Sequence, residues 1–444
     1  MQTRRDHLHA YQFATGRLAS ALVSGDAGNG EAPMRSAGLG AMFGVILAVL
    51  LVLGSAVFGL LMPAEDTSWE HDGALVVQKE TGTRYLYVKG QLHPTLNYSS
   101  ALLAAGSGAK VTEVSRTSLS KVRRGSTIGI AGAPDDIAEP GSLLTGAWAD
   151  CLRPGTRPVE RVDFSPNSAR AVSDDTRVLV SGPNDSRYVI WNDTKYLIKD
   201  RTSLLALGLD AERPIPSTQA WLDALPSGAS AGPATIPGAG EGGRTVAGTQ
   251  QPVGSLFRTV VGSTSHYYVL RADGLAPVNQ TESALLAAKP GGREPVQVSP
   301  TDIAAVPSSA DTTLLHRIPD LIAAKDTTSD RSGALCLKRS TSDHKAHPTV
   351  VRESGRVMTA RTAAVIPTEH AVLAAPPKQR GATGDPDKYL ITDQGVKYQL
   401  PGDAAQALGF GSVTPRTLPT TTLDQIANGP RLSRSRAVAV AGVD

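Results

Sequence analysis

One short stretch of the chain carries a pattern that serves nucleophilic catalysis in other proteins. Gly228, Ser230 and Gly232 spell G-x-S-x-G, a pattern in which a serine stands on a sharp turn between a strand and a helix. Here the pattern lies in the tract SGASAGPATIPGAGEGG, whose composition predicts neither a strand nor a helix beside the serine. We therefore predict no catalytic role for Ser230.

Patterns for nucleotide and metal binding are equally weak. Gly238, Gly240 and Gly243 spell G-x-G-x-x-G in the same tract, but a dinucleotide site needs a strand before the glycines and a helix after them. The chain contains no Gly-Lys pair, which excludes a P-loop. His344 and His347 could touch a metal, but no third ligand is apparent and a solvated loop is the better interpretation. We predict no catalytic residue and no metal ligand.

The chain has two cysteines, Cys151 and Cys336. Two residues cannot complete a four-ligand zinc site, whereas one disulfide fits a segment that lies outside the cytosol. A disulfide that closes a loop of about 185 residues would stabilise the fold by up to ~5 kcal/mol in the chain-entropy model. Two free buried thiols are the alternative, so the compartment of this region decides the question.

The composition predicts a folded, turn-rich chain. It has 444 residues with Gly 44, Pro 30 and a net charge of +3, and this length favours roughly two or three folded units. A nucleic-acid binder would need a basic face or stripe. The densest basic cluster is only Lys121, Arg123 and Arg124, so we expect no nucleic-acid partner.

Residues 39–62 predict a transmembrane helix. They read LGAMFGVILAVLLVLGSAVFGLLM without a charge, which is long enough to cross about 30 Å of hydrocarbon. Uncharged runs of this length are seldom buried helices of soluble proteins. A signal peptide would start nearer the N-terminus and have an apolar core of about 7–15 residues, and no A-x-A site follows the run here. We expect an uncleaved anchor.

The basic residues around this run predict its orientation. No Lys or Arg follows it until Lys79, whereas four arginines precede it. Because positively charged residues near a span stay in the cytoplasm, we expect residues 1–38 on the cytoplasmic side of the cell membrane. Residues 63–444 are then expected on its outer side. The cysteines then lie in an oxidising space. The four preceding arginines are Arg4, Arg5, Arg17 and Arg35.

Residues 3–24 predict a short amphipathic helix in the cytoplasmic head. An apolar face, interrupted by Thr15, is expected on one side and a polar face on the other. Such a helix can dock on partner proteins or lie on anionic lipid, and the weakly basic polar face favours docking. The expected apolar face contains Leu8, Tyr11, Leu18 and Leu22, and the expected opposite face contains Arg5, Gln12 and Arg17.

Four stretches of the outer region share one order of features. They start at Gly73, Arg177, Gly254 and His370. Each reads as an apolar strand, an aromatic strand and a third short strand, separated by turns that contain Gly, Asn or Asp. A small helix follows, which is expected to begin near a capping residue. Those residues are Asn97, Asp200, Asn279 and Gly402.

Each stretch also has a second signature further along the chain. It is an apolar residue followed three positions later by threonine and then by a short helical pattern, and we expect this threonine to cap each helix. Alone, a unit of about 45–55 residues buries too little surface to be stable, so the copies must pack on one another or on a core. The four threonines are Thr117, Thr218, Thr301 and Thr421.

Two insertions between these repeats carry one cysteine each. If Cys151 bonds Cys336, the insertions meet in a central core; repeats one and four would flank this core, and repeats two and three would follow each other outward. The expected segments are 1–38 head, 39–62 transmembrane helix, 63–129 first repeat, 130–176 first core segment, 177–232 second repeat, 233–253 flexible Gly-rich linker, 254–309 third repeat, 310–369 second core segment, and 370–444 fourth repeat with the C-terminal tail.

The order of these segments resembles the EccB family of actinobacterial type VII (ESX) secretion systems. The N-terminal signature of that family is matched by Thr3, Arg4, Tyr11, Phe13, Arg17, Ala21 and Leu22. The resemblance covers nearly the whole chain. It implies an α+β, β-rich fold: one N-terminal transmembrane helix, then an elongated extracytoplasmic domain of four small β/α repeats around a disulfide-linked core.

The resemblance also implies a function. A member of this family is a structural subunit of the inner-membrane complex. Within that complex the subunit forms a homo-oligomer and assembles with EccC, EccD and EccE. The machine exports WXG100-type proteins with energy from the FtsK-like EccC motor. The cytoplasmic helix would contact neighbouring subunits. The docking residues expected on it are Arg4, Tyr11, Phe13, Arg17, Leu18 and Leu22.

Two alternatives come with the same resemblance. Some family members are described as ATPases, which would make ATP a cofactor, although nothing in these residues supports it independently. The repeats of the family also resemble a cell-wall-binding phage lysin subunit, which raises peptidoglycan as a partner. We expect an assembly subunit without a cofactor and keep both alternatives for testing.

Overall fold

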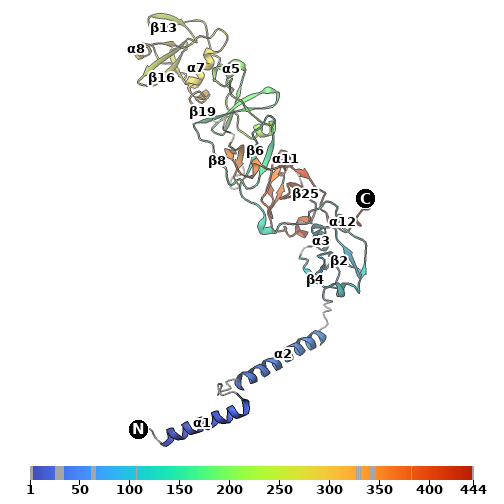
Figure 1. The fold of residues 1–444 in the computed structure, drawn as a ribbon. Helices are drawn as coiled ribbons and strands as arrows, with labels where there is room; N and C mark the ends of the chain where they lie inside the picture. Colours follow the sequence, from blue (N-terminus) through green and yellow to red (C-terminus); the bar gives the residue numbers. More distant parts are fainter. Residues whose placement is uncertain are drawn as a thin grey trace. The chain divides into compact units, whose positions relative to one another are not determined.

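The computed structural model describes residues 4–25, 35–61, 67–106, 108–326, 328, 330, 332–340, 347–381 and 383–442 (Figure 1). The chain divides into two units, Met1–Ser68 with Thr117–Lys121, and Trp69–Arg116 with Val122–Asp444. The first unit is helical and the second is rich in β-strands, which confirms the α+β, β-rich fold class.

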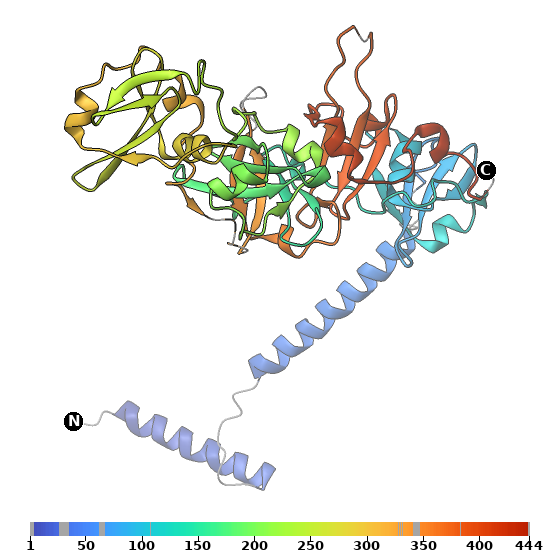
Figure 2. The same cartoon turned by 90° about the horizontal axis from the view of Figure 1, so that it is seen from above.

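Two long helices form most of the first unit, α1 (Arg4–Ser24) and α2 (Arg35–Leu61). Each is drawn as one continuous helix in Figure 2. Over Gly38–Val57 the mean hydropathy of α2 is 2.5 and no residue of this window is buried, so among the described residues α2 alone is long and apolar enough to cross a membrane. The apolar helix predicted over residues 39–62 is therefore present. The same unit contains all but the first residue of the short helix α4 (Arg116–Leu119).

Four sheets of the second unit share one order of strands. Three consecutive antiparallel strands come first, and a short strand after the first helix returns to pair in parallel with the first of them. The third strand gains a parallel partner after the second helix, as a strand or as the isolated bridges Lys195–Ser227 and Leu275–Ser308. Parallel returns of this kind need an intervening crossover, which the small helix supplies.

The first two of these sheets are built from the following strands. The first contains β1 (Leu75–Gln78), β2 (Arg84–Val88), β3 (Gln91–Pro94), β4 (Val111–Val114) and β5 (Arg123–Arg124). The second contains β9 (Thr176–Ser181), β10 (Arg187–Trp191), β11 (Thr194–Ile198) and β12 (Ile215–Pro216), with β19 (Lys325–Asp326) on β9.

The other two sheets come from later segments. The third contains β15 (Leu256–Val261), β16 (Thr264–Leu270), β17 (Leu275–Val278) and β18 (Val296–Gln297). The fourth contains β23 (Ala371–Ala375), β24 (Lys388–Thr392), β25 (Val396–Leu400), β26 (Arg416–Thr417) and β27 (Ala427–Asn428).

The first helix after each triplet of strands begins where the capping residues predict. Asn97 caps α3 (Tyr98–Ala105), Asp200 caps α5 (Arg201–Ala206) and Asn279 caps α7 (Gln280–Ala287), each by a side-chain oxygen that accepts from the backbone N–H three residues on. In the fourth copy the cap position of α10 (Ala404–Ala407) is Asp403 rather than Gly402, and it makes no side-chain capping bond.

The prediction for the second helix is wrong in three of its four copies. Thr218 caps α6 (Gln219–Asp223). In α4, α8 (Pro300–Ala304) and α11 (Thr420–Asp424) the threonine lies inside the helix. For α8 the reason is Pro300, which suits the first helical position and leaves Ser299 to cap the helix in a capping box with Asp302.

The two insertions build a six-stranded central sheet in the order β22-β7-β6-β20-β21-β8. Its antiparallel centre pairs one insertion with the other along β6 and β20. Its strands are β6 (Trp148–Leu152), β7 (Glu160–Asp163), β8 (Arg170–Ala171), β20 (Ala334–Arg339), β21 (Thr349–Glu353) and β22 (Ala364–Val365). The remaining short elements are η1 (Pro140–Ser142), η2 (Pro183–Asp185), η3 (Arg356–Met358), α9 (Thr313–Arg317) and α12 (Arg434–Ala437).

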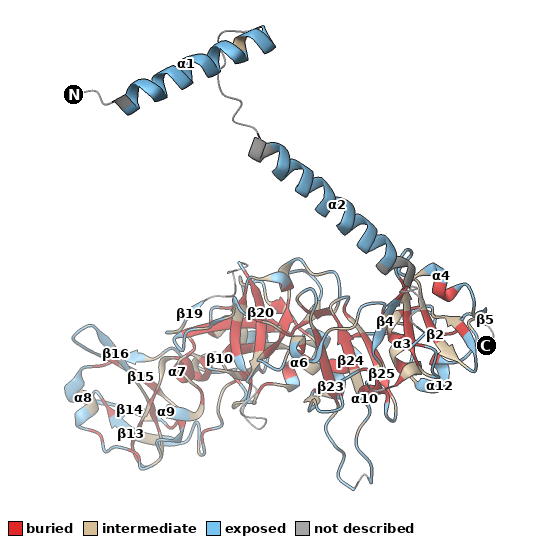
Figure 3. Ribbon diagram, turned by 90° about the horizontal axis from the view of Figure 1, so that it is seen from below, coloured by how far each residue is buried: buried red, intermediate tan, exposed pale blue. Residues whose placement is uncertain are grey.

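Packing between the sheets differs from the predicted order. Apolar clusters join the central sheet to the second sheet and to the fourth sheet, whereas the first sheet shares its cluster with the fourth. The third sheet packs on the second through Leu285. Repeats two and four therefore flank the core, and repeat one does not. Figure 3 shows the buried residues concentrated along these strands.

The Gly-rich segment 233–253 is not the flexible linker that its composition predicted. It contains a hairpin of β13 (Gly242–Val246) and β14 (Thr249–Pro252). The apolar residues that interrupt the glycines are buried, namely Ile236, Val246 and Val253. Composition alone missed these three anchors, whose burial fixes the segment against the third sheet.

Candidate assembly surfaces and internal junctions

Helix α1 offers most of its apolar side chains to solvent. Tyr11, Phe13, Leu18 and Leu22 are each more than half exposed. At 3.6 residues per turn, Tyr11, Leu18 and Leu22 lie along one side of the helix and Phe13 lies on the opposite side, whereas Arg17 lies about a third of a turn from the apolar side. Arg4 is the first residue of the helix. The predicted docking residues therefore do not share one side of α1, because Phe13 lies opposite Tyr11, Leu18 and Leu22.

The same geometry corrects the predicted polar face. Arg5 and Arg17 each lie about a third of a turn from the apolar side, on opposite flanks, and Gln12 lies a little over a quarter turn from it, so none of the three is directly opposite. Thr15 donates its hydroxyl to the backbone oxygen of Tyr11 at 2.8 Å. That bond satisfies the hydroxyl within the helix, so Thr15 does not disturb the face that it interrupts.

The central sheet contains the disulfide. Cys151 on β6 and Cys336 on β20 are opposite each other in the antiparallel register, with their Cα atoms 4.0 Å apart. Both are fully buried, and the bond closes a separation of 185 residues. It joins the two insertions at the centre of the sheet, as the sequence predicted.

Glu160 on β7 connects the central sheet to two equivalent helices. Its carboxylate accepts hydrogen bonds from the Thr218 hydroxyl at the start of α6 and from the Gln425 amide after α11. Burial raises the pKa of Glu160, and the two hydrogen bonds oppose that change. One carboxylate thus fixes the second and fourth sheets on the same core.

Two further carboxyls lie inside the central sheet. Burial, together with the charge of Glu160, raises the pKa of Asp150 to about 8, while Arg339 lowers it. Burial raises the pKa of Asp163 to about 6, against the backbone hydrogen bond from Ser165. Carboxyls with a strongly raised pKa can mark catalytic sites, but these two lie at the junction of packed sheets.

The junction between the second and third sheets depends on a buried ion pair. Arg317 donates to both carboxylate oxygens of Glu282, at 2.9 and 3.0 Å, and the Glu282 side chain is fully buried. The same guanidinium donates to the backbone oxygens of Ser230 and Gly232, at 3.1 and 2.7 Å. Nothing in the sequence around either charged residue signals this pairing.

These contacts explain the G-x-S-x-G pattern without catalysis. A Cβ atom on Gly228 would lie 2.2 Å from the Tyr196 ring, and one on Gly232 would lie 2.8 Å from the Lys199 side chain. The Ser230 hydroxyl donates to the Leu197 backbone oxygen. The glycines are therefore required by close packing on β11.

Equivalent glycines serve the first and fourth sheets. A Cβ on Gly125 would lie 2.3 Å from the His93 ring, and one on Gly429 would lie 2.2 Å from the Tyr398 ring. The sequence contains this signal, a residue with a ring in the third strand and a glycine about 30 residues later. In the second copy the resemblance to a catalytic pattern around Ser230 conceals it.

The second glycine pattern belongs to the hairpin of β13 and β14. Gly243 lies on β13, where a Cβ would come within 2.5 Å of the Gln251 backbone oxygen.

Of the two histidines considered as metal ligands, His347 is among the residues that the structure describes and His344 is outside them. Among the described residues no three His, Cys, Asp or Glu side chains form a group that could hold a metal ion.

A family comparison identifies the class to which this chain, with its apolar helix of spanning length and its disulfide, belongs. Residues 1–443 match the family model described as type VII secretion system ESX-1, transport TM domain B. The chain belongs to this family, EccB.

Relatives with the same family name are similar over most of their lengths. The ESX-1 secretion system ATPase EccB1 of Mycobacterium tuberculosis is 28% identical over 466 residues, covering 98% of this chain and 94% of the relative. The ESX-3 secretion system ATPase EccB3 of Mycolicibacterium smegmatis is 26% identical over 476 residues, covering 98% and 90%.

Solved structures show the same fold. A chain of an intact ESX-5 inner membrane complex matches with a TM-score of 0.61 and 23% identity, covering all of this chain and 96% of that one. A chain of the EccB3 dimer from the ESX-3 core complex matches with a TM-score of 0.57 and 24% identity, covering 82% and 100%.

Proposed function

We propose that this protein is a structural subunit of a type VII secretion complex in the inner membrane, where it contributes to the extracytoplasmic region of the machine. The observation that carries the proposal is the family match over residues 1–443. It agrees with two features of the chain, namely an apolar helix of spanning length and a β-rich unit with a buried disulfide.

The orientation and partners follow from the same proposal. The arginines before α2 and the acidic residues after it favour an N-terminus in the cytoplasm, and the disulfide favours an oxidising space for the second unit. In the cytoplasm the two sides of α1 would contact EccC-, EccD- and EccE-like subunits. Several copies of this chain would assemble in one complex that exports WXG100-type proteins.

Export is the direct test of this proposal. Deleting the gene should abolish release of WXG100-type proteins into the medium, and expression of the wild-type chain should restore it. The membrane levels of intact complex, measured by native electrophoresis, should fall with export because an assembly subunit is missing. Unchanged export in the deletion strain would refute the proposal.

The relatives are named as ATPases, so a catalytic role needs its own test. An assembly role requires no turnover by this chain. The purified full chain in detergent should hydrolyse ATP no faster than a matched preparation from cells without it. Turnover that persists through purification and is lost on a single substitution would favour the ATPase alternative.

A cell-wall-binding role is the other alternative. Sedimentation of the detergent-solubilised full chain with isolated peptidoglycan tests it. We expect the chain to stay in the supernatant, and saturable co-sedimentation would favour a wall-binding module.

A further inference from the structure

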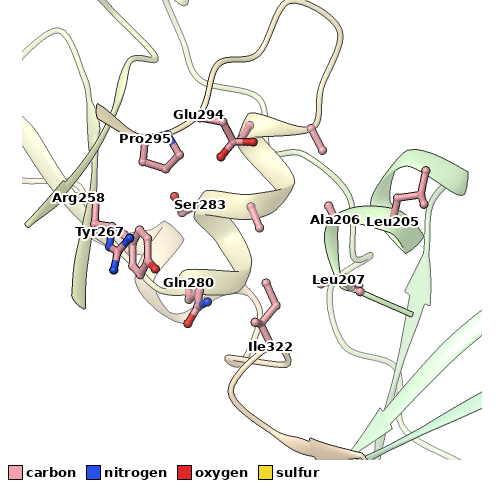
Figure 4. A pocket seen from close by; sticks show the side chains of 14 residues that line it. Leu205, Ala206, Leu207, Arg258, Tyr267, Gln280, Ser283, Glu294, Pro295 and Ile322 are labelled. Atoms are coloured by element: carbon pink, nitrogen blue, oxygen red, sulfur yellow. The ribbon is translucent and has the colours of Figure 1, made fainter. Parts of the chain in front are cut away.

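A cavity of about 530 Å³ lies between the second and third sheets (Figure 4). One wall is the end of α5, from Leu205 to Gly208, and the other is formed by α7 and by strands β15 and β16. Ala284 and Ala287 of α7 and Ala288 just after it contribute small side chains to this wall, beside Gln280 and Ser283 of the same helix. The cavity therefore has room for a ligand several atoms long.

Two opposite charges line this cavity without neutralising each other. The Arg258 guanidinium donates to the Ser265 hydroxyl at 3.1 and 2.9 Å, and it forms no ion pair with any residue that the structure describes. Glu294 is exposed and likewise lacks an ion-pair partner there. Because no described side chain of opposite charge pairs with either group, both remain available to form charge-assisted hydrogen bonds with a ligand.

A buried hydroxyl lies in the same wall. Ser283 on α7 is 1% exposed, and its Oγ has no hydrogen-bond partner in the described portion of the molecule. Buried hydroxyls are nearly always hydrogen-bonded, so this orphaned group points to a missing partner. Figure 4 shows Ser283 near Glu294 and Pro295, with Arg258 beside Tyr267 on the facing strands.

We propose that this cavity binds a short peptide that has a free carboxylate and a free amine. Arg258, with the hydroxyl of Tyr267, would bind the carboxylate as a charge-assisted pair. Glu294 would bind the ammonium, and Ser283 would hydrogen-bond a peptide group between the two ends. The alanines of α7 and the end of α5 would contact the small side chains of such a ligand. This site is independent of the secretion assignment.

Ligand-observed saturation-transfer NMR on the detergent-solubilised full chain tests the proposal. The probes are tri-alanine with free ends, its N-acetylated form and its C-terminally amidated form. Free tri-alanine should bind, and each blocked form should bind at least about tenfold more weakly because one charged contact is lost.

Substitutions assign each end of the ligand to its residue. Arg258→Gln should remove the preference for a free carboxylate over the amide, and Glu294→Gln should remove the preference for a free amine over the acetylated end. Arg293→Gln, an exposed neighbour that does not line the cavity, should change neither preference. Thermal unfolding of each variant verifies that it folds.

Three results would overturn the proposal. The first is no binding of free tri-alanine up to about 10 mM, a concentration at which even a very weak site is occupied. The second is equal binding of free and blocked peptides. The third is a pair of variants, folded as the wild type, that retain both preferences.

Discussion

At the scale of single residues, glycines and buried carboxyls have structural roles that the local sequence pattern does not indicate. Gly228 lies against the Tyr196 ring, and equivalent glycines meet His93 and Tyr398 in other sheets. The pattern G-x-S-x-G arises because close packing needs glycines at the positions that flank Ser230. A short motif therefore has meaning only in its structural context.

Gly228→Ala should destabilise the second unit. Its Cβ would lie 2.2 Å from the aromatic ring, so the strand or the ring must shift, at a cost of about 1–3 kcal/mol. Chemical unfolding monitored by tryptophan fluorescence measures the loss. Ser230→Ala is the matched control and should change stability by less than about 1 kcal/mol; a reversed order would contradict this role of Gly228.

Asp150→Asn should make the protein less sensitive to pH. The pKa of Asp150 is about 8 in the folded state, against an ordinary value of 3.8. The folded chain therefore keeps a proton that the unfolded chain releases, and stability falls as pH rises from about 4 to 8, by at most about 1.4 kcal/mol per pH unit. The neutral asparagine removes this penalty.

Thermal unfolding at pH 5 and pH 7.5 measures that effect. The Tm of Asp150→Asn relative to wild type should be higher at pH 7.5 than at pH 5. Carboxyls that do not interact with Asp150 are the same in both proteins, so they cancel in the comparison. A Tm difference that does not change with pH would show that Asp150 is ionised in the folded state.

At the scale of elements, short helices connect the sheets through a few buried polar contacts. Glu160 holds α6 and α11 on the central sheet, and Arg317 at the end of α9 holds α7 and the segment after β11. These contacts bridge residues far apart in the sequence. The arrangement of the sheets therefore depends on a small number of side chains.

Arg317→Met should destabilise the junction between the second and third sheets. It leaves the fully buried Glu282 carboxylate without its partner, which typically costs about 3–5 kcal/mol. The double variant Arg317→Met, Glu282→Gln should recover some of this loss because no buried charge is left. Chemical unfolding of the two single variants and the double variant completes the cycle, and additive losses would exclude a coupled pair.

Tyr11→Ala with Leu18→Ala should release the other membrane subunits from this chain. Both side chains lie exposed on one side of α1, and each truncation at a buried interface typically costs about 1 kcal/mol or more. Affinity purification in mild detergent measures how much of each subunit is retained. Gln12→Ala, on the flank of the helix, is the control, and equal retention by both proteins would place the interface elsewhere.

At the scale of the whole molecule, the architecture was largely predictable and its packing was not. The apolar run 39–62 and the caps Asn97, Asp200 and Asn279 followed from local chemistry, and the Cys151–Cys336 pair followed from two cysteines in a region expected outside the cytosol. The positions of repeats one and two relative to the core did not, because the contacts that decide them join distant segments: Val180 packs with Leu335 of the central sheet, and Leu103 packs with Leu373 of the fourth sheet.

The sequence did not predict the hairpin within 233–253 or the ion pair of Arg317 with Glu282, for related reasons. Three isolated apolar residues anchor the hairpin among many glycines, so average composition conceals them. A single arginine and a single glutamate 35 residues apart form no pattern in sequence, and only the fold brings them together.

The native mass of the purified membrane assembly tests the role of this chain as an assembly subunit most directly. A tag on this chain, mild detergent and native mass spectrometry would give the composition of the particle that contains it. We expect more than one copy of this chain together with other secretion subunits in one particle. A particle with the mass of one chain, about 46.2 kDa, in membranes that are active in export, would contradict that role.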